Sequence, residues 1–270
     1  MASVLQPSLE VTGDDLEREG ESLAQLPGTW NVFVAHLGGQ TVEEFVQDCL
    51  RVRQWGHQPV PHLTARRYRN PEHLAETIRR LHGEAAVREA LVLAGDVESA
   101  GSLKDSLDVM DSGVLEHGLL ERVWFSGYPE GHPQIDEKHL EEAWERKMNW
   151  SRSCRIPIGV VTQLAKNPSV SAEWCRRREF GENGVAARIS RFLFARPEIL
   201  EDLARLAGMP ALLQMVRESG GGPYVCGPAA EGGEESALRA CAPHYMALGA
   251  LRRTATELSE LFGGGGDKPR

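Results

Sequence analysis

Three side chains that could do chemistry are crowded into one short segment of the sequence. Tyr128, Glu130 and His132 lie within five residues, interleaved with Pro129 and Gly131, directly after the apolar run at residues 123–126. A phenol, a carboxylate and an imidazole can all exchange protons or form hydrogen bonds. In α/β folds, loops that leave the end of a strand commonly carry such groups. The alternative is a solvated turn set by the prolines, and this segment alone does not decide between the two.

Similar polar groups accompany most of the other strand candidates. They are Glu10 in the first, His36 in the second, His62 and Thr64 in the third, Asp96 after the fourth and Gln163 after the sixth. The carboxyl ends of parallel strands meet at one face, so the pattern predicts that these side chains converge. Each has a structural alternative: Glu10 could lie on the surface, Asp96 could cap a helix, and the histidines could be hydrogen-bonded packing residues.

The order of apolar and amphipathic patterns predicts the elements that would position these groups. Eight strand candidates are expected at residues 8–12, 31–37, 58–64, 90–95, 123–126, 156–162, 185–194 and 241–248. Helical patterns follow them at 13–26, 42–55, 70–82, 103–120, 135–150, 171–180, 197–218 and 252–262, with a glycine-rich loop at 219–236. Alternation of this kind implies a parallel sheet, and eight units in about 250 residues fit a (β/α)8 TIM barrel.

An open, doubly wound sheet is the alternative architecture. No G-x-G-x-x-G motif follows the first strand candidate, which disfavours a dinucleotide-binding fold of that type. We therefore predict one barrel domain over residues 1–262. The four glycines at 263–266 and the residues after them predict a flexible tail at 263–270.

Composition excludes several classes of function. A net charge of -9 argues against a nucleic-acid partner, because phosphate backbones are held mainly by clustered Lys and Arg. The longest apolar runs are too short to cross a bilayer, and no basic segment followed by an apolar one begins the chain. We expect a cytoplasmic protein without a membrane partner. Its five cysteines include no C-x-x-C pair, so reduced thiols are expected.

A zinc site built from His36, His62 and His132 is one further alternative, since imidazoles from separate strands can bind zinc. The sequence has no H-x-H or H-E-x-x-H pair that would make such a site specific. We therefore predict no metal.

Taken together, the motifs resemble those of the methylenetetrahydrofolate reductases, barrel enzymes that use FAD to move a hydride from a nicotinamide cofactor to methylenetetrahydrofolate. The segments that carry the resemblance are Ser8-Leu-Glu10, Pro61-His-Leu-Thr64, Gly95-Asp96, the segment from Tyr128 to Pro133, Thr162-Gln163 and, loosely, Pro243-His-Tyr245. They are collinear with the family's motifs and extend over most of the chain.

The resemblance implies an oxidoreductase that interconverts 5,10-methylenetetrahydrofolate and 5-methyltetrahydrofolate. It implies FAD as cofactor, NADH or NADPH as co-substrate and a tetrahydrofolate derivative as substrate. Glu10 would be the general acid, with a pKa raised by a water-poor site, and Asp96 would contact the pterin and tune the flavin. Gln163 would hydrogen-bond the pterin ring. The residues implied at the cofactor are His62, Thr64, Gly95, Tyr128, Glu130 and His132.

Departures from the family's pattern leave other functions open. Thr12 and Gly13 stand where the family has aromatic and proline residues, Ala94 replaces an arginine expected near the flavin, and no aromatic run follows Gln163. One alternative is an enzyme that works without flavin or that oxidises methyltetrahydrofolate. Another, of a different class, is a non-catalytic barrel that binds folate or a partner protein. Self-association into a homo-oligomer is also left open.

Overall fold

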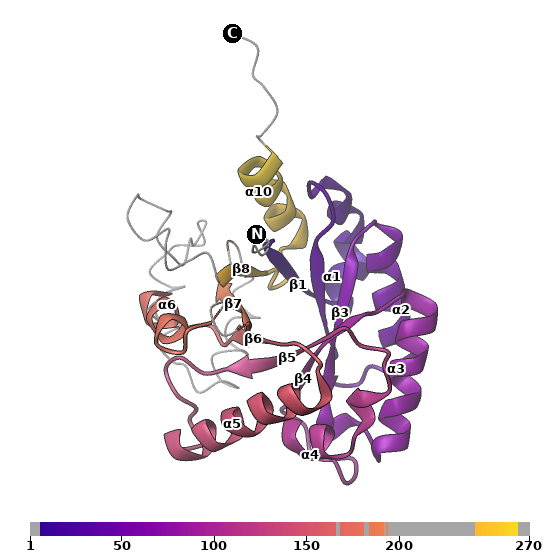
Figure 1. Ribbon diagram of the computed structural model, residues 1–270. Coiled ribbons are helices and arrows are strands. Elements are labelled where there is room, and N and C mark those ends of the chain that lie inside the picture. The colour runs from indigo at the N-terminus through magenta and orange to yellow at the C-terminus, as the bar shows by residue number, and fades with distance from the viewer. Residues whose placement is uncertain (1–5, 166–167, 181–183, 192, 194–240, 264–270) are drawn as a thin grey trace.

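The computed structural model describes residues 6–165, 168–180, 184–191, 193 and 241–263. Within these residues eight strands close a barrel in the order β1 to β8, and every neighbouring pair is parallel (Figure 1). The strands are β1 Ser8–Thr12, β2 Asn31–Ala35, β3 Gln58–Thr64, β4 Glu89–Leu93, β5 Arg122–Gly127, β6 Ile158–Thr162, β7 Ala186–Arg191 and β8 Cys241–Met246. The predicted single (β/α)8 barrel is confirmed.

Helices connect the strands on the outside of the barrel (Figure 1). The α-helices are α1 Gly13–Glu19, α2 Val42–Gln54, α3 Pro71–Ala85, α4 Ser106–Asp111, α5 Glu137–Cys154, α6 Pro168–Arg177 and α10 Leu251–Gly263. Short 3₁₀ helices lie at Gly20–Gln25, Ala65–Arg67 and Val114–Glu116. The helix and loop predicted at 197–218 and 219–236 lie outside the described residues, as does the predicted tail after Gly263.

One predicted helix is much shorter than expected. The pattern over residues 103–120 predicts a single helix, but α4 ends at Asp111 and a 3₁₀ turn follows. Gly113 separates the two pieces with a φ of 73°, a left-handed conformation that favours glycine and interrupts the helix.

Local sequence sets the helix starts near the barrel's open end. Thr12 caps α1 and Thr41 caps α2, each in a reciprocal capping box with the carboxylate three residues later, Asp15 or Glu44. Such boxes satisfy backbone N–H groups that the first helical turn leaves without partners. They fix where the chain leaves β1 and where it enters α2.

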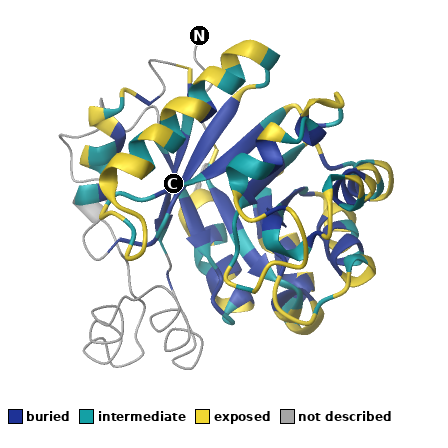
Figure 2. Ribbon diagram, turned by 90° about the horizontal axis from the view of Figure 1, so that it is seen from below, coloured by how far each residue is buried: buried dark blue, intermediate teal, exposed yellow. Residues whose placement is uncertain are grey.

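Alternate residues of each strand point to opposite sides of the barrel wall. One set packs outwards against the helices, and the other fills the interior, where Phe33, Val60, Leu91, Trp124 and Val161 form a separate apolar cluster. Figure 2 shows the strands buried inside a ring of helices whose outer faces are exposed. Polar residues on the inward positions therefore mark the candidate site.

Gly159 of β6 supplies a test of this interior packing. A Cβ atom at this position would lie 2.4 Å from the ring of Trp124, which is fully buried. We expect Gly159→Ala to lower the free energy of unfolding by about 1–3 kcal/mol, because the core must shift to admit the methyl group. Gly83→Ala on α3 is the matched control: nothing lies within 4 Å of its added Cβ, and a gain of about 0.5–1 kcal/mol is expected. Urea unfolding followed by circular dichroism measures both, and equal effects would contradict the packing argument.

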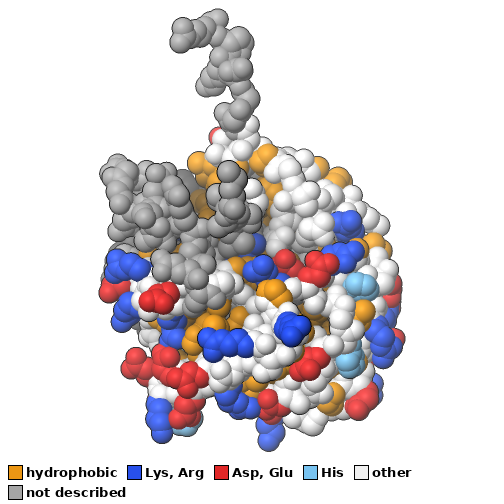
Figure 3. All heavy atoms as spheres, in the orientation of Figure 1, with side chains coloured by type: hydrophobic (Ala, Val, Ile, Leu, Met, Phe, Trp, Pro, Cys, Tyr) orange, Lys and Arg blue, Asp and Glu red, His pale blue; other side chains and the backbone are white. Residues whose placement is uncertain are grey.

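The surface carries both signs of charge. On the face that Figure 3 shows, Lys and Arg side chains are interspersed with Asp and Glu over the described residues. Within that same part of the chain, no helix combines the length and the apolar character needed to cross a membrane.

Candidate active site

A carboxylate shared by two imidazoles lies inside the barrel. Glu10 of β1 places its Oε2 atom 3.1 Å from Nε2 of His244 on β8 and 3.4 Å from Nε2 of His62 on β3. Ser8, two residues before Glu10 and therefore on the same face of β1, lies with its Oγ 2.8 Å from Nδ1 of His244. The side chains of Glu10 and His62 are 16% and 12% exposed, whereas His244 is only 1% exposed. Glu10 and His62 are thus the partly exposed members of the group, and Nε2 of His62 is itself buried against Glu10.

The neighbours of Glu10 determine its ionisation. Burial raises the pKa of the carboxyl, but the charges of His62 and His244 and their hydrogen bonds outweigh burial and bring the pKa well below its usual range. Burial lowers the pKa of His244, and the positive charge of Arg188 adds to this effect. The consistent arrangement at neutral pH is an ionised Glu10 that accepts a hydrogen bond from a neutral His244. Nδ1 of His244 then accepts the Ser8 hydroxyl.

This direction differs from the one expected for Glu10. The resemblance implies a general acid with a raised pKa, which is the effect of burial acting alone. The two imidazole partners reverse it. In this geometry Glu10 is an ionised hydrogen-bond acceptor and a weak base, and the imidazole of His62 is its partly exposed neighbour.

An aromatic and cationic layer lies next to the Glu10 cluster. The ring of Phe33 contacts His244 at a centroid distance of 4.7 Å and Trp124 at 5.8 Å. The guanidinium of Arg188, 2% exposed, lies 4.8 Å from the Trp124 ring centre and donates to the carbonyl of Gln6 at 2.9 Å. Burial lowers the pKa of Arg188 to about 10, which leaves it charged at neutral pH. A buried positive charge near His244 favours the neutral form of that imidazole.

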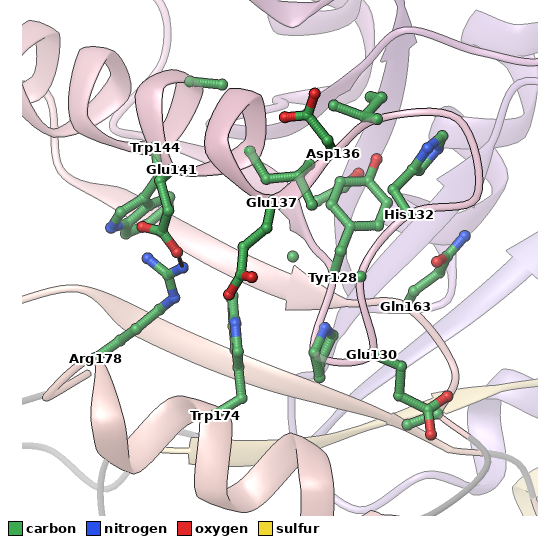
Figure 4. A pocket seen from close by; sticks show the side chains of 18 of the residues that line it. Tyr128, Glu130, His132, Asp136, Glu137, Glu141, Trp144, Gln163, Trp174 and Arg178 are labelled. Atoms are coloured by element: carbon green, nitrogen blue, oxygen red, sulfur yellow. Dashed lines mark hydrogen bonds and ion pairs between the residues drawn. The ribbon is translucent and has the colours of Figure 1, made fainter.

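The loop after β5 lines a different space. A cavity of about 930 Å³ lies beside the ends of β5 and β6, between α5 and α6. Figure 4 shows Tyr128 and His132 on one side and Trp174, Arg178 and Glu141 on the other, with Gln163 at the edge. The rings of Tyr128 and His132 meet edge to face at 4.9 Å. Glu130 also lines the cavity and is exposed.

The remaining predicted residues lie at the ends of β3 and β4. Gly95 has a φ of +95°, and a Cβ there would lie 2.1 Å from Cγ2 of Thr64, so the close approach of the two segments requires glycine. Thr64 is buried and Asp96 is exposed. The predicted residues therefore fall into separate groups. Glu10 lies beside His62, and Thr64 lies against Gly95. The residues around the cavity are Tyr128, Glu130, His132 and Gln163. Glu10, His62 and Asp96 are not among the residues that line it.

His36 is a packing residue. Its ring stacks on Phe45 of α2 at a centroid distance of 4.2 Å and an interplanar angle of 9°, and it is only 6% exposed. Among the described residues, no group of three or more His, Cys, Asp or Glu side chains is arranged to hold a metal ion. His36, His62 and His132 therefore do not form the zinc site considered as an alternative.

The burial of His36 makes the stability of the fold depend on pH. Burial lowers the pKa of His36 to about 4 from 6.5, with a smaller contribution from the charge of Arg67. The unfolded chain therefore takes up a proton at higher pH than the folded one, and stability falls as pH decreases from 6.5 towards 4. This residue alone accounts for a loss of about 2–3 kcal/mol between pH 7.5 and 4.5.

Replacement of His36 by Phe tests this expectation, because Phe keeps a stacked ring and cannot titrate. Urea unfolding at pH 7.5 and 4.5 should show a pH-dependent loss that is smaller by about 2–3 kcal/mol than in the unaltered protein. His117→Phe, an exposed histidine after the turn at Val114–Glu116, is the matched control and should leave the loss unchanged. An equal loss in the His36 variant would contradict the assignment of this residue.

Sequence reasoning gave no role to three residues of the barrel interior. Ser8 and His244 complete the hydrogen-bonded group around Glu10, and Arg188 adds a buried charge beside it. The alternation of inward and outward side chains along each strand is a sequence signal that identifies them. Ser8 shares the inward face of β1 with Glu10, and β8 is in register with β1 such that Ser8 is paired with His244. A polar residue on an inward position of a barrel strand needs a partner there.

Comparisons with known proteins add little beyond the barrel. No family model matches the chain. Dihydropteroate synthase from Yersinia pestis is similar at 9% identity and a TM-score of 0.47, over 98% of this chain and 95% of that one. Dihydropteroate synthase from Thermus thermophilus is similar at 10% identity and a TM-score of 0.49, over 97% of this chain and 96% of that one. At such low identity the likeness concerns the fold alone.

These findings correct the functional interpretation of the sequence. Three solved structures that the chain resembles over nearly its whole length are dihydropteroate synthases, and methylenetetrahydrofolate reductases are not indicated. The predicted family, the hydride-transfer function, the oxidoreductase class and the flavoprotein description are therefore wrong. The motifs behind them are two to six residues long and mark the ends of barrel strands, where short polar motifs recur in unrelated barrels. Binding of FAD and of NADH or NADPH is tested by neither the structure nor the comparisons, and it stays a prediction that flavin absorbance of the purified protein can check.

Proposed function

We propose that the protein is an enzyme that transfers a proton to or from a small heterocyclic molecule bound at the open end of the barrel. The observation that carries the proposal is the carboxylate of Glu10, held between two imidazoles inside the barrel. A buried carboxylate needs a partner that offsets the cost of burying its charge. Here the closest partners can themselves gain and lose protons, and two of the three groups remain partly open.

The members of this group have different roles. Glu10 holds a proton-bearing group of the ligand as a hydrogen-bond acceptor, because its carboxylate is ionised and its lowered pKa makes it a weak base. His62, 3.4 Å away, exchanges that proton with the ligand or with solvent. His244 and Ser8 hold the carboxylate in one orientation from the closed side.

The chemistry of Glu10 also indicates a class of ligand. Both imidazoles lie at Oε2, so Oε1 is the oxygen that a ligand would meet, and it can accept from the adjacent amino and ring N–H groups at one edge of a pterin. The Phe33 ring, which is fully buried, packs against both histidines and holds them beside the carboxylate. A pterin or a reduced folate derivative is therefore the ligand class that we propose.

Calorimetric titration with a dihydropterin tests both parts of the proposal. Binding should be measurable at micromolar to millimolar concentration, and its enthalpy should change with the ionisation enthalpy of the buffer if a proton moves on binding. Glu10→Gln should weaken binding by roughly 10-fold or more, since the charge-assisted hydrogen bonds at Oε1 are lost. Glu98→Gln, which alters an exposed carboxylate, is the control. An absence of binding at millimolar ligand would reject the ligand class, and unchanged binding by the Glu10 variant would reject the site.

A further inference from the structure

Helix α5 places a lysine, instead of an apolar residue, against the barrel wall. Of the 18 residues of this helix, all of which the structure describes, only Lys147 is buried, at 9% exposure. Its Nζ atom lies 4.8 Å from the centre of the Phe125 ring, which belongs to β5 and is fully buried. The amine is therefore held at the wall, whereas long lysine side chains usually carry their charge back into water.

This buried amine has no carboxylate at ion-pair distance among the described residues. Lys138, on the same helix, differs in both respects: its side chain is 83% exposed, and its Nζ lies 3.6 Å from Glu142. The charge of Asp105, the N-cap of α4, favours the ammonium form of Lys147, but burial outweighs it and lowers the pKa of Lys147 to about 8 from 10.5. About a tenth of the Lys147 side chains are then neutral amines at pH 7.

Lys147 also lines the cavity of about 930 Å³ beside the ends of β5 and β6, which is large enough for a small organic molecule. Figure 4 shows Trp144 of α5, Trp174 of α6 and Tyr128 among the residues around this space. Within the described part of the chain Nζ of Lys147 makes no hydrogen bond, yet it is not sealed from solvent. A molecule in the cavity can therefore meet the amine.

We propose that this cavity is a second site, at which the amine of Lys147 captures a small aromatic aldehyde as an imine. The inference is independent of the function proposed for the Glu10 cluster, because Glu10 does not line the cavity. A lysine nucleophile needs an apolar setting that disfavours the ammonium, and the Phe125 ring contributes to one here. The aromatic part of the ligand class follows from Trp144 and Trp174, against which a flat ring can pack.

Imine formation requires neither an oxidant nor a reductant. The neutral amine nitrogen attacks the carbonyl carbon and forms a C–N bond, while a proton passes from the nitrogen to the carbonyl oxygen. The resulting carbinolamine then loses its oxygen as water, and the nitrogen gives up its second proton. In total the C=O bond is replaced by a C=N bond, and the two amine protons leave with the carbonyl oxygen as one water molecule.

Reductive trapping with benzaldehyde tests the proposal on the full-length protein. Sodium cyanoborohydride delivers a hydride to the imine carbon, and peptide mass spectrometry then locates the stable benzylamine. At pH 7 Lys147 should be labelled roughly 10-fold or more faster than Lys138, because a larger fraction of its side chain is neutral. Peptide mapping separates this label from that on the α-amino group, which also reacts at this pH.

The dependence on benzaldehyde concentration tests for a binding site. The rate of labelling at Lys147 should saturate, whereas the rate at Lys138 should stay proportional to concentration. An unlabelled Lys147, a rate no higher than that of Lys138, or a rate at Lys147 that stays proportional to benzaldehyde would each overturn the proposal.

Variants and unfolding separate the site from the local sequence. Lys147→Met keeps the length of the side chain and should abolish the saturable label, whereas the matched control Lys138→Met should retain it. In concentrated urea the preference for Lys147 should disappear, and a preference that persists there would also overturn the proposal. Because the mapping of the unaltered protein needs no variant, a poorly folded Lys147→Met protein does not prevent a decision.

Discussion

Replacement of Glu10 by Gln is expected to lower the rate of proton exchange between a bound ligand and solvent by roughly 10²–10⁴-fold. The amide has nearly the shape of the carboxylate but lacks the negative charge that holds the proton-bearing group of the ligand and stabilises a proton in transit beside it. Its carbonyl oxygen can take the Oε2 position that the two imidazoles share, so their contacts can persist while the charge is lost. The measurement is the loss of ligand proton signals in deuterated buffer, followed by NMR with a dihydropterin present.

Two further variants make that result specific to the carboxylate. Glu10→Asp keeps the charge on a shorter side chain and should recover part of the rate. His62→Gln should also slow exchange, because it removes the group that passes the proton onwards. Melting temperatures of all three proteins show whether the fold is intact. Exchange at the unaltered rate in a folded Glu10→Gln protein would remove Glu10 from the acceptor role.

The pH profile of the same reaction carries an independent expectation. Since the pKa of Glu10 lies well below its usual range, the carboxylate is ionised throughout pH 5–8. Exchange should therefore show no loss of activity from protonation of Glu10 as pH falls to 5. The stability of the fold depends on Glu10 in a related way. Ionised Glu10 contributes to the free energy of unfolding above the unfolded pKa of 4.5, and this contribution is lost as pH falls below it.

Strand positions could be predicted because the signals are local. β1 and β3 have the predicted limits, although Pro59 and Pro61 argued against a central strand at β3. The structure removes that objection. The backbone N–H of Gln58 donates to the carbonyl of Trp30 on the β2 side. Backbone groups of successive residues point to opposite neighbours in a parallel sheet, so the nitrogens of Pro59 and Pro61 face β4. β3 pairs with β4 only from His62 onwards, and no hydrogen bond is lost at either proline.

The candidate site could be predicted only in part. Glu10 and His62 were identified because each is a polar residue within a strand of the barrel. Their partner His244 lies 234 residues after Glu10, and their contact depends on the closure of the barrel between β1 and β8. Without that partner, burial is the one visible influence on Glu10, and the direction of its pKa shift comes out wrong.

The grouping of the β5 loop with Glu10 shows a second limit. Tyr128, His132 and Gln163 follow neighbouring strands and were expected to share one site with Glu10. In the structure they surround a cavity between α5 and α6 that Glu10 does not line. Strand order fixes which loops are neighbours, but the parity of each residue and the length of each loop decide whether its side chain faces the barrel axis or the outer helices.

Trp124 is the residue whose truncation should cost the fold most. Its ring is fully buried in the barrel interior, contacts Phe33 and Arg188, and covers Gly159. Trp124→Ala is expected to lower the free energy of unfolding by about 3–5 kcal/mol, because a large cavity is left in a closed barrel that cannot collapse to fill it. Chemical unfolding monitored by circular dichroism measures the loss.

The comparison with Trp124→Phe divides this loss between packing and hydrogen bonding. The indole Nε1 donates to Oε2 of Glu89 at 2.7 Å, and Asn31 also donates to that oxygen, at 3.2 Å. Phe keeps most of the ring contacts and removes only the first bond, so a smaller loss of about 1–2 kcal/mol is expected. Trp55→Ala, at an exposed tryptophan, should cost less than either. A loss below about 1 kcal/mol for Trp124→Ala would mean that the interior is loosely packed. Arg188, which lies against this ring, would then not be held beside His244 by packing.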